Sequence, residues 1–300
     1  MDVAVTGSSG FIGTPLVAAL EAAGHRVRRV VRRRARGPAE VAWDPSAGTI
    51  DADGLAGVDA VVHLAGEGIN AKRWTAGQKQ RILDSRTRGT ALIAETVARL
   101  DPPPSVLVSG SAIGYYGDRG DEVLTENSPA GDDFLAEVCV AWEGAAQSAV
   151  AAGVRTAFVR TGIVLDPGGG ALAKMLPLFK LGLGGRLGGD QWWSWISLAD
   201  EVGAIVHLLH ADVAGPVNLT APAPVTNAEL TRTLGAVLRR PTVVPVPSFG
   251  PQLLLGRELA QSLLYSSARI APTRLEASGY RFRHPALEAA LRSMLGGPPP

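Results

Sequence analysis

Val3-Ala-Val-Thr-Gly-Ser-Ser-Gly-Phe-Ile-Gly13 stands near the start of the chain and decides its fold. Its first residues are small and apolar and predict a strand, whereas the apolar spacing from Ile12 to Ala23, ended by Gly24, predicts a helix. Three glycines separated by two residues each therefore lie in a turn between a strand and a helix. This arrangement is typical of a turn that binds the pyrophosphate of a dinucleotide.

Each glycine of this turn has a physical reason to be there. Gly7 permits the tight turn, Gly10 lets the backbone approach a pyrophosphate, and Gly13 lets the helix pack closely on the strand. Backbone amides at the start of the helix then face the phosphates, and the helix dipole adds to the attraction. The alternative interpretation is a glycine-rich turn without a ligand. We predict that the cofactor contacts the whole turn, namely Gly7, Ser8, Ser9, Gly10, Phe11, Ile12 and Gly13.

A run of arginines at the end of the second predicted strand indicates which dinucleotide binds. An NAD site usually has an acidic residue here that holds the ribose 2′-hydroxyl, but no Asp or Glu lies between Glu21 and Glu40. A guanidinium instead suits a 2′-phosphate, because its planar fork can bind two phosphate oxygens. We therefore expect Arg32 and Arg33 to bind NADP (NADPH) in preference to NAD. A solvated basic loop and a nucleic-acid patch are the alternatives, and a net charge of +1 disfavours the second.

Strand and helix signals alternate over the first half of the chain. Helical patterns cover residues 78–100 and 132–152, the second of them closed by Gly153. The alternation predicts an α/β fold with a Rossmann-type, doubly wound parallel sheet over residues 1–165, completed by later segments. We expect the first strand in the interior of that sheet. The predicted strands are Val3–Val5, Val27–Val31, Val58–Leu64, Val106–Val108 and Thr156–Val159.

The second half of the chain differs in composition from the first, with glycine clusters and a tryptophan-rich stretch at Trp192–Trp195. We interpret residues 166–297 as a smaller C-terminal substrate lobe, with helices over 249–264 and 287–295 and a frayed tail at 298–300. A small C-terminal domain within this lobe is expected from about residue 247.

Composition and length exclude several classes of protein. The 300 residues are 46% hydrophobic and 19% charged, which favours a folded core over disorder. Cys139 is the only cysteine, so no intrachain disulfide can form, and no cluster of His, Cys and acidic residues has metal-ligand spacing. The chain opens without a signal-type segment and has no apolar stretch of roughly 18 residues. We therefore expect a cytoplasmic protein without metal, membrane or nucleic-acid partners, and the oligomeric state stays open.

Several motifs, taken in order, carry a family resemblance. Asp59-Ala-Val-Val-His-Leu-Ala-Gly66 follows the glycine turn, and Asp84-Ser-Arg-Thr-Arg-Gly-Thr90, Ser111-Ala-Ile-Gly-Tyr-Tyr-Gly117 and Arg160-Thr-Gly-Ile-Val-Leu165 come later. Together they resemble the extended and atypical short-chain dehydrogenase/reductase superfamily of NAD-dependent epimerases and dehydratases. The chain is most similar to an uncharacterised epimerase-like subfamily. Residues 247–291 resemble the small C-terminal domain of unknown function found in that subfamily.

The resemblance adds residues to the expected cofactor site. It implies that Leu64, Ala65 and Gly66 pack beside the adenosine and ribose, where small residues let the cofactor approach the backbone. Arg86 and Ser109 are expected in the same set. Arg86 stands where superfamily members often have an asparagine, and it either binds an anionic group or braces its helix. We interpret His63 as a packing residue at the end of its strand.

The resemblance also implies a tyrosine and a lysine four residues apart on one helix, the pair that moves the proton accompanying hydride transfer. Here the matching positions, before Trp142-Glu143, hold Leu135 and Cys139, which cannot perform that role. We interpret Cys139 as a small core residue.

Ser111, Tyr115 and Tyr116 are the best remaining catalytic candidates, because their loop leaves the carboxyl end of a strand. Both tyrosines could equally be packing residues, and Glu126 could orient the loop. We expect an NADP(H)-dependent oxidoreductase or epimerase-like enzyme acting on an unidentified small-molecule carbonyl or alcohol. The alternative is a non-catalytic NADP(H)-binding sensor.

Overall fold

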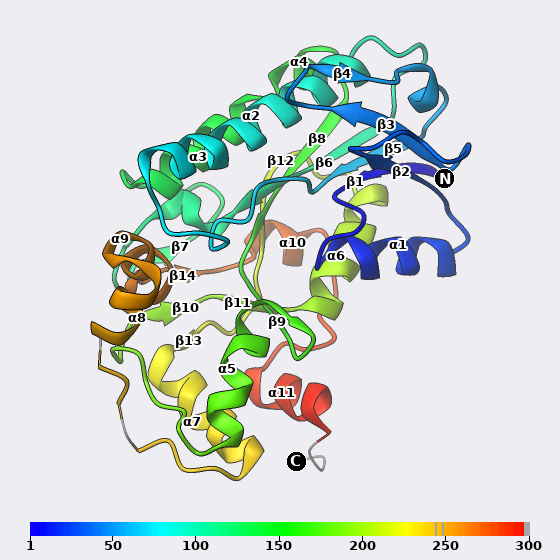
Figure 1. Ribbon diagram of the computed structural model, residues 1–300. Coiled ribbons are helices and arrows are strands. Elements are labelled where there is room, and N and C mark those ends of the chain that lie inside the picture. Colours follow the sequence, from blue (N-terminus) through cyan, green and yellow to red (C-terminus); the bar gives the residue numbers. More distant parts are fainter. Residues whose placement is uncertain (244, 248, 297–300) are drawn as a thin grey trace.

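The computed structural model describes residues 1–243, 245–247 and 249–296, and a large twisted sheet lies at its centre (Figure 1). The eight strands follow the order β12-β8-β6-β5-β1-β2-β3-β4, and only the β3–β4 pair is antiparallel. The strands are β1 (Asp2–Thr6), β2 (Arg26–Val31), β3 (Glu40–Asp44), β4 (Thr49–Ile50), β5 (Ala60–His63), β6 (Val106–Ala112), β8 (Arg155–Thr161) and β12 (Gly215–Leu219).

The predicted Rossmann-type parallel sheet is confirmed, and β1 lies in its interior between β2 and β5. The chain moves outward from β1 to β2 and β3 on one side, then returns to build β5, β6, β8 and β12 on the other. Ligands of open α/β sheets bind at the carboxyl ends of the strands where this reversal occurs. The expected cofactor turn therefore lies at the reversal, directly after β1.

Helices cover both faces of the sheet (Figure 1). One face carries α1 (Gly13–Ala22) and α6 (Leu198–His210), and the other carries α2 (Ala76–Val97), α3 (Phe134–Gly144) and α4 (Gln147–Ala151). The helix expected over residues 132–152 is thus divided in two. Its first part ends at Gly144, consistent with the low helix propensity of glycine.

Alternation along the strands decides which side chains meet which helices. Val3 and Val5 pack in the core shared with α1 and α6, whereas Ala4 packs in the core shared with α2 and α4. Since successive side chains of a strand point to opposite faces, Thr6 falls on the α2 side of the sheet. The polar residues at the carboxyl ends of neighbouring strands share that side, namely Thr6, His63, Ser109, Ser111 and Arg160.

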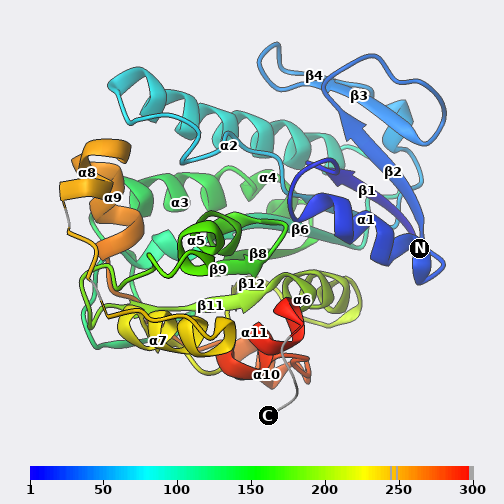
Figure 2. The ribbon, with the colours of Figure 1, turned by 60° about the horizontal axis from the view of Figure 1, so that its bottom comes forward.

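The second half of the chain forms a body beside the carboxyl edge of the sheet (Figure 2). Its core includes Leu172, Trp195, Leu234 and Leu291, contributed by several segments. β12 and α6 belong to the sheet layer, and the boundary near residue 165 stays a prediction. The other elements are α5 (Gly170–Lys180), α7 (Asn227–Leu238), α8 (Phe249–Leu255), α9 (Arg257–Ala260), a π-helix (Gln261–Tyr265), α10 (Thr273–Ala277), α11 (Leu287–Leu295), β9 (Ile163–Asp166), β11 (Trp195–Ser197) and the short pairs β10–β13 (Trp192–Trp193, Val225–Thr226) and β7–β14 (Val123–Leu124, Arg269–Ile270).

The described part of the chain bears on two further expectations. Within it, no helix combines the length and the apolar character needed to cross a bilayer. The same residues contain no group of three or more His, Cys, Asp or Glu side chains placed to hold a metal ion. The expected end of the lobe at residue 297 and the tail at 298–300 lie outside the described residues.

Candidate functional site

The turn between β1 and α1 requires glycine at two of its three glycine positions. Gly7 has a φ of +65°, and a Cβ atom there would come within 3.0 Å of the backbone of Leu64 and Ala65. A Cβ on Gly13 would lie only 2.0 Å from the carbonyl oxygen of Gly7. Gly13 therefore permits the close approach of the helix to the turn itself, and Gly7 permits the close approach of the turn to the end of β5.

Gly10 is exposed and has more room than Gly7 and Gly13. A Cβ atom there would meet only the Gly7 carbonyl oxygen, at 3.1 Å. The first residues of α1 also receive no side-chain cap at Ile12, so amide groups at the helix start remain for an anion. The ring of Phe11 lies against the turn that leads into α5, where a Cβ on Gly169 would approach it to 2.4 Å. This geometry fits the pyrophosphate of a dinucleotide.

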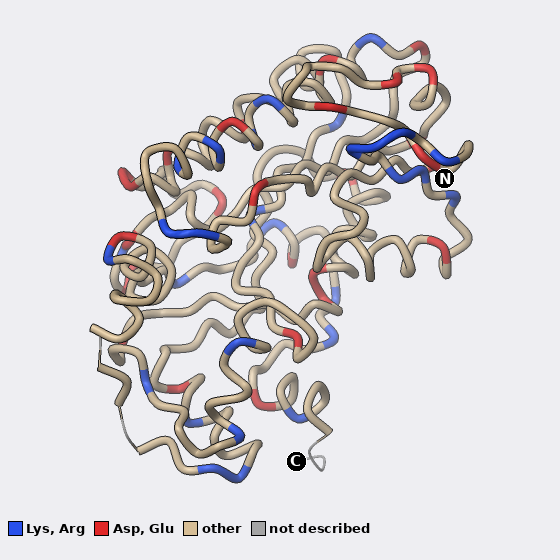
Figure 3. Tube along the Cα trace, viewed as in Figure 1, with Lys and Arg blue, Asp and Glu red and all other residues tan. Residues whose placement is uncertain are grey.

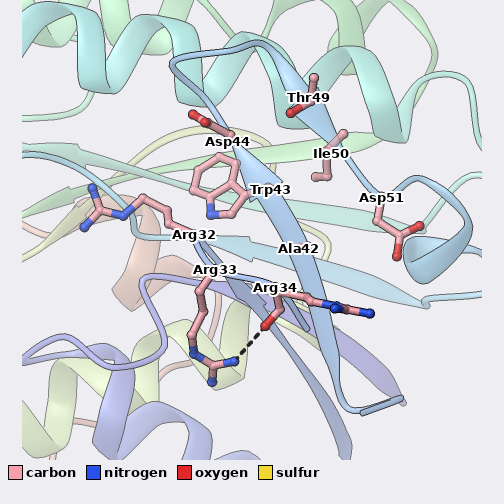
Figure 4. Close-up of a pocket in the computed structure, with 9 residues that line it drawn as sticks. All are labelled: Arg32, Arg33, Arg34, Ala42, Trp43, Asp44, Thr49, Ile50 and Asp51. Carbon is pink, nitrogen blue, oxygen red and sulfur yellow. Dashed lines mark hydrogen bonds between the residues drawn. The ribbon is translucent and has the colours of Figure 1, made fainter. Parts of the chain in front are cut away.

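The arginine run lines an open pocket of about 360 Å³ beside the ends of β2 and β3 (Figure 4). The guanidinium of Arg33 donates two hydrogen bonds to the carboxylate of Glu40, one from Nη1 at 2.6 Å and one from Nη2 at 2.5 Å. Hydrogen bonds from Arg33 and from the Arg36 amide lower the pKa of Glu40 to about 2. The lining residues are Arg32, Arg33, Arg34, Ala42, Trp43, Asp44, Thr49, Ile50 and Asp51.

Arg32 differs from Arg33 in its surroundings. The three arginine side chains point in different directions in Figure 4, and among the described residues Arg32 has no acceptor for its guanidinium. The second strand is also a basic stretch close to the N-terminus in Figure 3, while other Lys and Arg residues are scattered over the chain among acidic ones. Of the two expected phosphate ligands, Arg32 is thus free and Arg33 is already paired.

Thr6 holds the end of β5 beside the glycine turn. Its Oγ1 accepts hydrogen bonds from the Leu64 amide at 3.1 Å and the Ala65 amide at 3.2 Å. The same hydroxyl shares a 2.8 Å hydrogen bond with Nδ1 of His63. Burial lowers the pKa of His63 to about 4, so its imidazole is neutral at pH 7. Thr6 thereby places the expected segment from Leu64 to Gly66 next to Gly7.

Arg86 reaches from α2 to the chain that leaves β5. Its Nη1 donates to the carbonyl oxygens of Glu67 at 2.9 Å and Ile82 at 3.2 Å. Its guanidinium carbon lies 4.8 Å from the ring of Trp142, and a Cβ on Gly66 would lie 3.5 Å from it. Burial lowers the pKa of Arg86.

Ser111 forms a buried polar pair with a residue of α3. Its hydroxyl donates to Oε1 of Glu143 at 2.7 Å. The same carboxylate accepts two hydrogen bonds from Arg160, at 2.8 Å from Nε and 2.9 Å from Nη2. Burial alone would lower the pKa of Arg160, but the hydrogen bonds and charge of Glu143 outweigh it and raise that pKa. Ser111 is therefore held by an ion pair between α3 and β8.

The two tyrosines after β6 have different surroundings. The hydroxyl of Tyr116 donates to Oδ1 of Asn218 at 2.6 Å and accepts from Nη1 of Arg160 at 3.0 Å. Burial raises the pKa of Tyr116, which is fully enclosed. Tyr115 is half-buried, and its ring lies 3.4 Å from the guanidinium carbon of Arg160. Tyr116 thus braces Arg160, and Tyr115 covers it.

Leu135 and Cys139 pack against the chain at and just after the end of β6. A Cβ on Gly114 would lie 3.1 Å from the Cβ of Leu135, and Sγ of Cys139 lies 3.6 Å from the Ala112 carbonyl oxygen. Burial and the nearby Glu143 raise the pKa of Cys139 to about 12, so the thiol is neutral. Neither side chain can exchange a proton near pH 7.

The remaining candidates, Glu126 and Ser109, are buried, as is Asp200 of α6. Glu126 accepts hydrogen bonds from the amides of Asn218 and Arg274, both at 3.1 Å, so it ties the C-terminal segment to β12. Asp200 accepts from the amides of two C-terminal residues, at 2.7 and 2.9 Å, and so holds that segment against α6. Ser109 is fully buried beside His63 on the neighbouring strand, and its hydroxyl has no partner within the described part of the chain.

Glu143 and Arg160, which hold Ser111, were not predicted as site residues from the sequence. A signal was present, because Arg160 is a charged residue directly after the apolar run 157–159 of its strand, and buried arginines are almost always paired. The partner could not be read from the sequence, since Glu143 lies seventeen positions away on a helix.

Comparisons with known proteins agree with this geometry. Residues 3–220 match the NAD dependent epimerase/dehydratase family, and residues 246–294 match a domain of unknown function (DUF1731). The epimerase family protein MT2273 of Mycobacterium tuberculosis is 46% identical over 96% of each chain. The human epimerase family protein SDR39U1 is 39% identical over 98% of this chain and 100% of its own length.

Two solved structures extend the comparison. The crystal structure of human SDR39U1 (isoform 2) with NADPH superimposes with a TM-score of 0.89, at 37% identity over 99% of both chains. A nucleoside-diphosphate sugar epimerase from Corynebacterium glutamicum superimposes with a TM-score of 0.81, at 39% identity over 99% of this chain and 58% of that one. With its parallel sheet, glycine turn and matched family model, this chain belongs to the NAD-dependent epimerase/dehydratase family.

Proposed function

We propose that this family member binds NADP(H) with the pyrophosphate on the glycine turn and the adenosine 2′-phosphate beside Arg32. The observation that carries the proposal is the pair of features at the ends of β1 and β2: an uncapped helix start over Gly10, and a free guanidinium at Arg32. Anions are stabilised at helix N-termini, and a guanidinium binds phosphate oxygens in pairs. The NADPH bound to the human relative supports the same choice of cofactor.

We further propose that the protein is an oxidoreductase or epimerase-like enzyme for a small-molecule alcohol or carbonyl. Bound NADP(H) supplies hydride transfer at C4 of its nicotinamide. Because the Ser111 hydroxyl donates to Glu143, its oxygen is free to accept a hydrogen bond from a substrate hydroxyl. Ser111 can then pass its own proton to Oε1 of Glu143 as it takes one from the substrate. Arg160 keeps the carboxylate in position for that transfer.

A screen of sugar nucleotides, other alcohols and carbonyls, followed by nicotinamide absorbance, tests the catalytic part. Once a substrate is found, Ser111→Ala should lower turnover by about 10²–10⁴-fold, as expected for loss of acid–base assistance, and leave NADPH affinity nearly unchanged. Full turnover in this variant would remove Ser111 from the reaction. Calorimetry with NADPH and NADH tests the cofactor part, and equal affinities would contradict it.

A second candidate function rests on Leu135 and Cys139. These two apolar side chains occupy the positions at which the resemblance implies a tyrosine and a lysine. A protein that kept its cofactor turn and lost its proton donor would act as an NADP(H)-binding sensor. Tight NADPH binding combined with no turnover across the screen would favour this function over catalysis.

A further inference from the structure

The guanidinium of Arg86 lies close to the position at which the resemblance implies a lysine. Arg86 belongs to α2, whereas Cys139 belongs to α3, and the two helices pack against each other on the same face of the sheet. The guanidinium carbon of Arg86 lies 4.8 Å from the ring of Trp142, which follows Cys139 by three residues on α3. A cation from the neighbouring helix therefore contacts α3 within one helical turn of position 139.

The guanidinium of Arg86 is held in place, but some of its hydrogen-bond donors have no acceptor among the described residues. Only Nη1 donates to backbone carbonyls, those of Glu67 and Ile82, while the ring of Trp142 packs against the guanidinium. Nε and Nη2 have no acceptor among the residues that the structure describes. The side chain is half-buried, so these remaining donors belong to a fixed and partly accessible cation. Because these donors are partly accessible, they are available to hydrogen-bond a ligand.

The position of Arg86 relative to the strands indicates what those donors can bind. In the order β2-β1-β5-β6, the Arg32 pocket lies at the end of β2 and the pyrophosphate turn at the end of β1. A dinucleotide with its adenosine at β2 and its pyrophosphate at β1 must extend its other half toward β5 and β6. Gly66 follows β5 and Ala112 ends β6, and Arg86 and Cys139 contact the chain at these two places.

We propose that Arg86 replaces the missing lysine and donates hydrogen bonds to the ribose hydroxyls in the nicotinamide half of NADP(H). This inference rests on the proposed NADP(H) site. Gly66 lies directly beside it, because a Cβ there would be in ordinary van der Waals contact with the guanidinium at 3.5 Å. The arginine comes from α2 rather than α3, so the cation is retained although the family position holds a cysteine.

The test compares two ligands by calorimetry. NADPH carries the nicotinamide half, and adenosine 2′,5′-bisphosphate carries only the adenosine half with its 2′-phosphate. In Arg86→Asn we expect NADPH affinity to fall about 10–100-fold, as for loss of charge-assisted hydrogen bonds, with adenosine 2′,5′-bisphosphate affinity unchanged. Arg88→Asn is the matched control, because Arg88 is an exposed arginine on the same helix that pairs with Asp84, and both affinities should stay at wild-type values.

A rescue variant separates a ligand contact from a packing effect. The double substitution Arg86→Asn with Cys139→Lys moves the cation to the family position and should recover most of the NADPH affinity. Arg86→Lys keeps the charge without the planar fork, so its NADPH affinity should lie between those of wild type and Arg86→Asn. If thermal unfolding shows that the double variant does not fold, the NADPH affinity of Arg86→Lys tests the proposal instead.

Three results would overturn the inference. Unchanged NADPH affinity in Arg86→Asn would show that the donors bind nothing on the cofactor. An equal loss for both ligands would show that Arg86 only braces the site. Wild-type protein that binds neither ligand would overturn the proposed NADP(H) site itself, and the inference with it.

Discussion

Gly13→Ala should destabilise the fold because the new methyl group has no room. Its Cβ would lie 2.0 Å from the carbonyl oxygen of Gly7 and 2.8 Å from the carbonyl carbon. Both atoms are backbone, so α1 and the turn must move apart. Severe overpacking lowers the free energy of unfolding by about 3 kcal/mol. The higher helix propensity of alanine offsets at most about 1 kcal/mol of this loss. We expect a net loss of about 2 kcal/mol and a fall in Tm of roughly 4 °C.

Gly10→Val provides the matched comparison within the same turn. Its Cβ would meet only the Gly7 carbonyl oxygen, at 3.1 Å, so the Tm should fall less than in Gly13→Ala. The branched side chain would occupy the space that the pyrophosphate needs, so NADPH binding should be abolished. Differential scanning calorimetry and NADPH titration of both variants give the two readouts. A Gly13→Ala protein as stable as wild type, or a Gly10→Val protein that binds NADPH normally, would refute this reasoning.

Two further predictions concern charged residues. Arg32→Ala should reduce the preference for NADPH over NADH by roughly tenfold or more. Arg33→Ala should reduce that preference less, because Arg33 is already paired with Glu40. Calorimetry of both variants with both cofactors measures the preference, and equal effects of the two substitutions would contradict the prediction. Burial raises the pKa of Glu201 from 4.5 to about 8. Between these pH values the folded protein keeps a proton on Glu201 that the unfolded chain loses. The free energy of unfolding therefore falls as pH rises through this window. Glu201→Gln should flatten that fall in denaturant titrations from pH 5 to 8, and an unchanged slope would exclude Glu201 as its cause.

Local pattern was sufficient to predict the core of the fold and the cofactor turn. The alternation of apolar runs predicted five strands that the structure contains, and the glycine spacing located the turn after β1. These features depend on residues close together in the chain, because strand and helix periods and glycine conformations are set locally. Three strands of the sheet, β3, β4 and β12, were not predicted. Their apolar signal is short, and β12 begins with Gly215-Pro216.

The pairing of charged side chains was decided only by the tertiary structure. Arg32 and Arg33 read alike in the sequence, but β3 pairs beside β2 and brings Glu40 to the guanidinium of Arg33 and not to that of Arg32. Ser111 was predicted as a catalytic candidate, yet its hydrogen bond to Glu143 exists because α3 packs against that strand. Parallel strands gather residues distant in the chain at one edge of the sheet, and their alternation selects the face on which side chains meet. No local pattern carries that information, because it depends on which strands become neighbours.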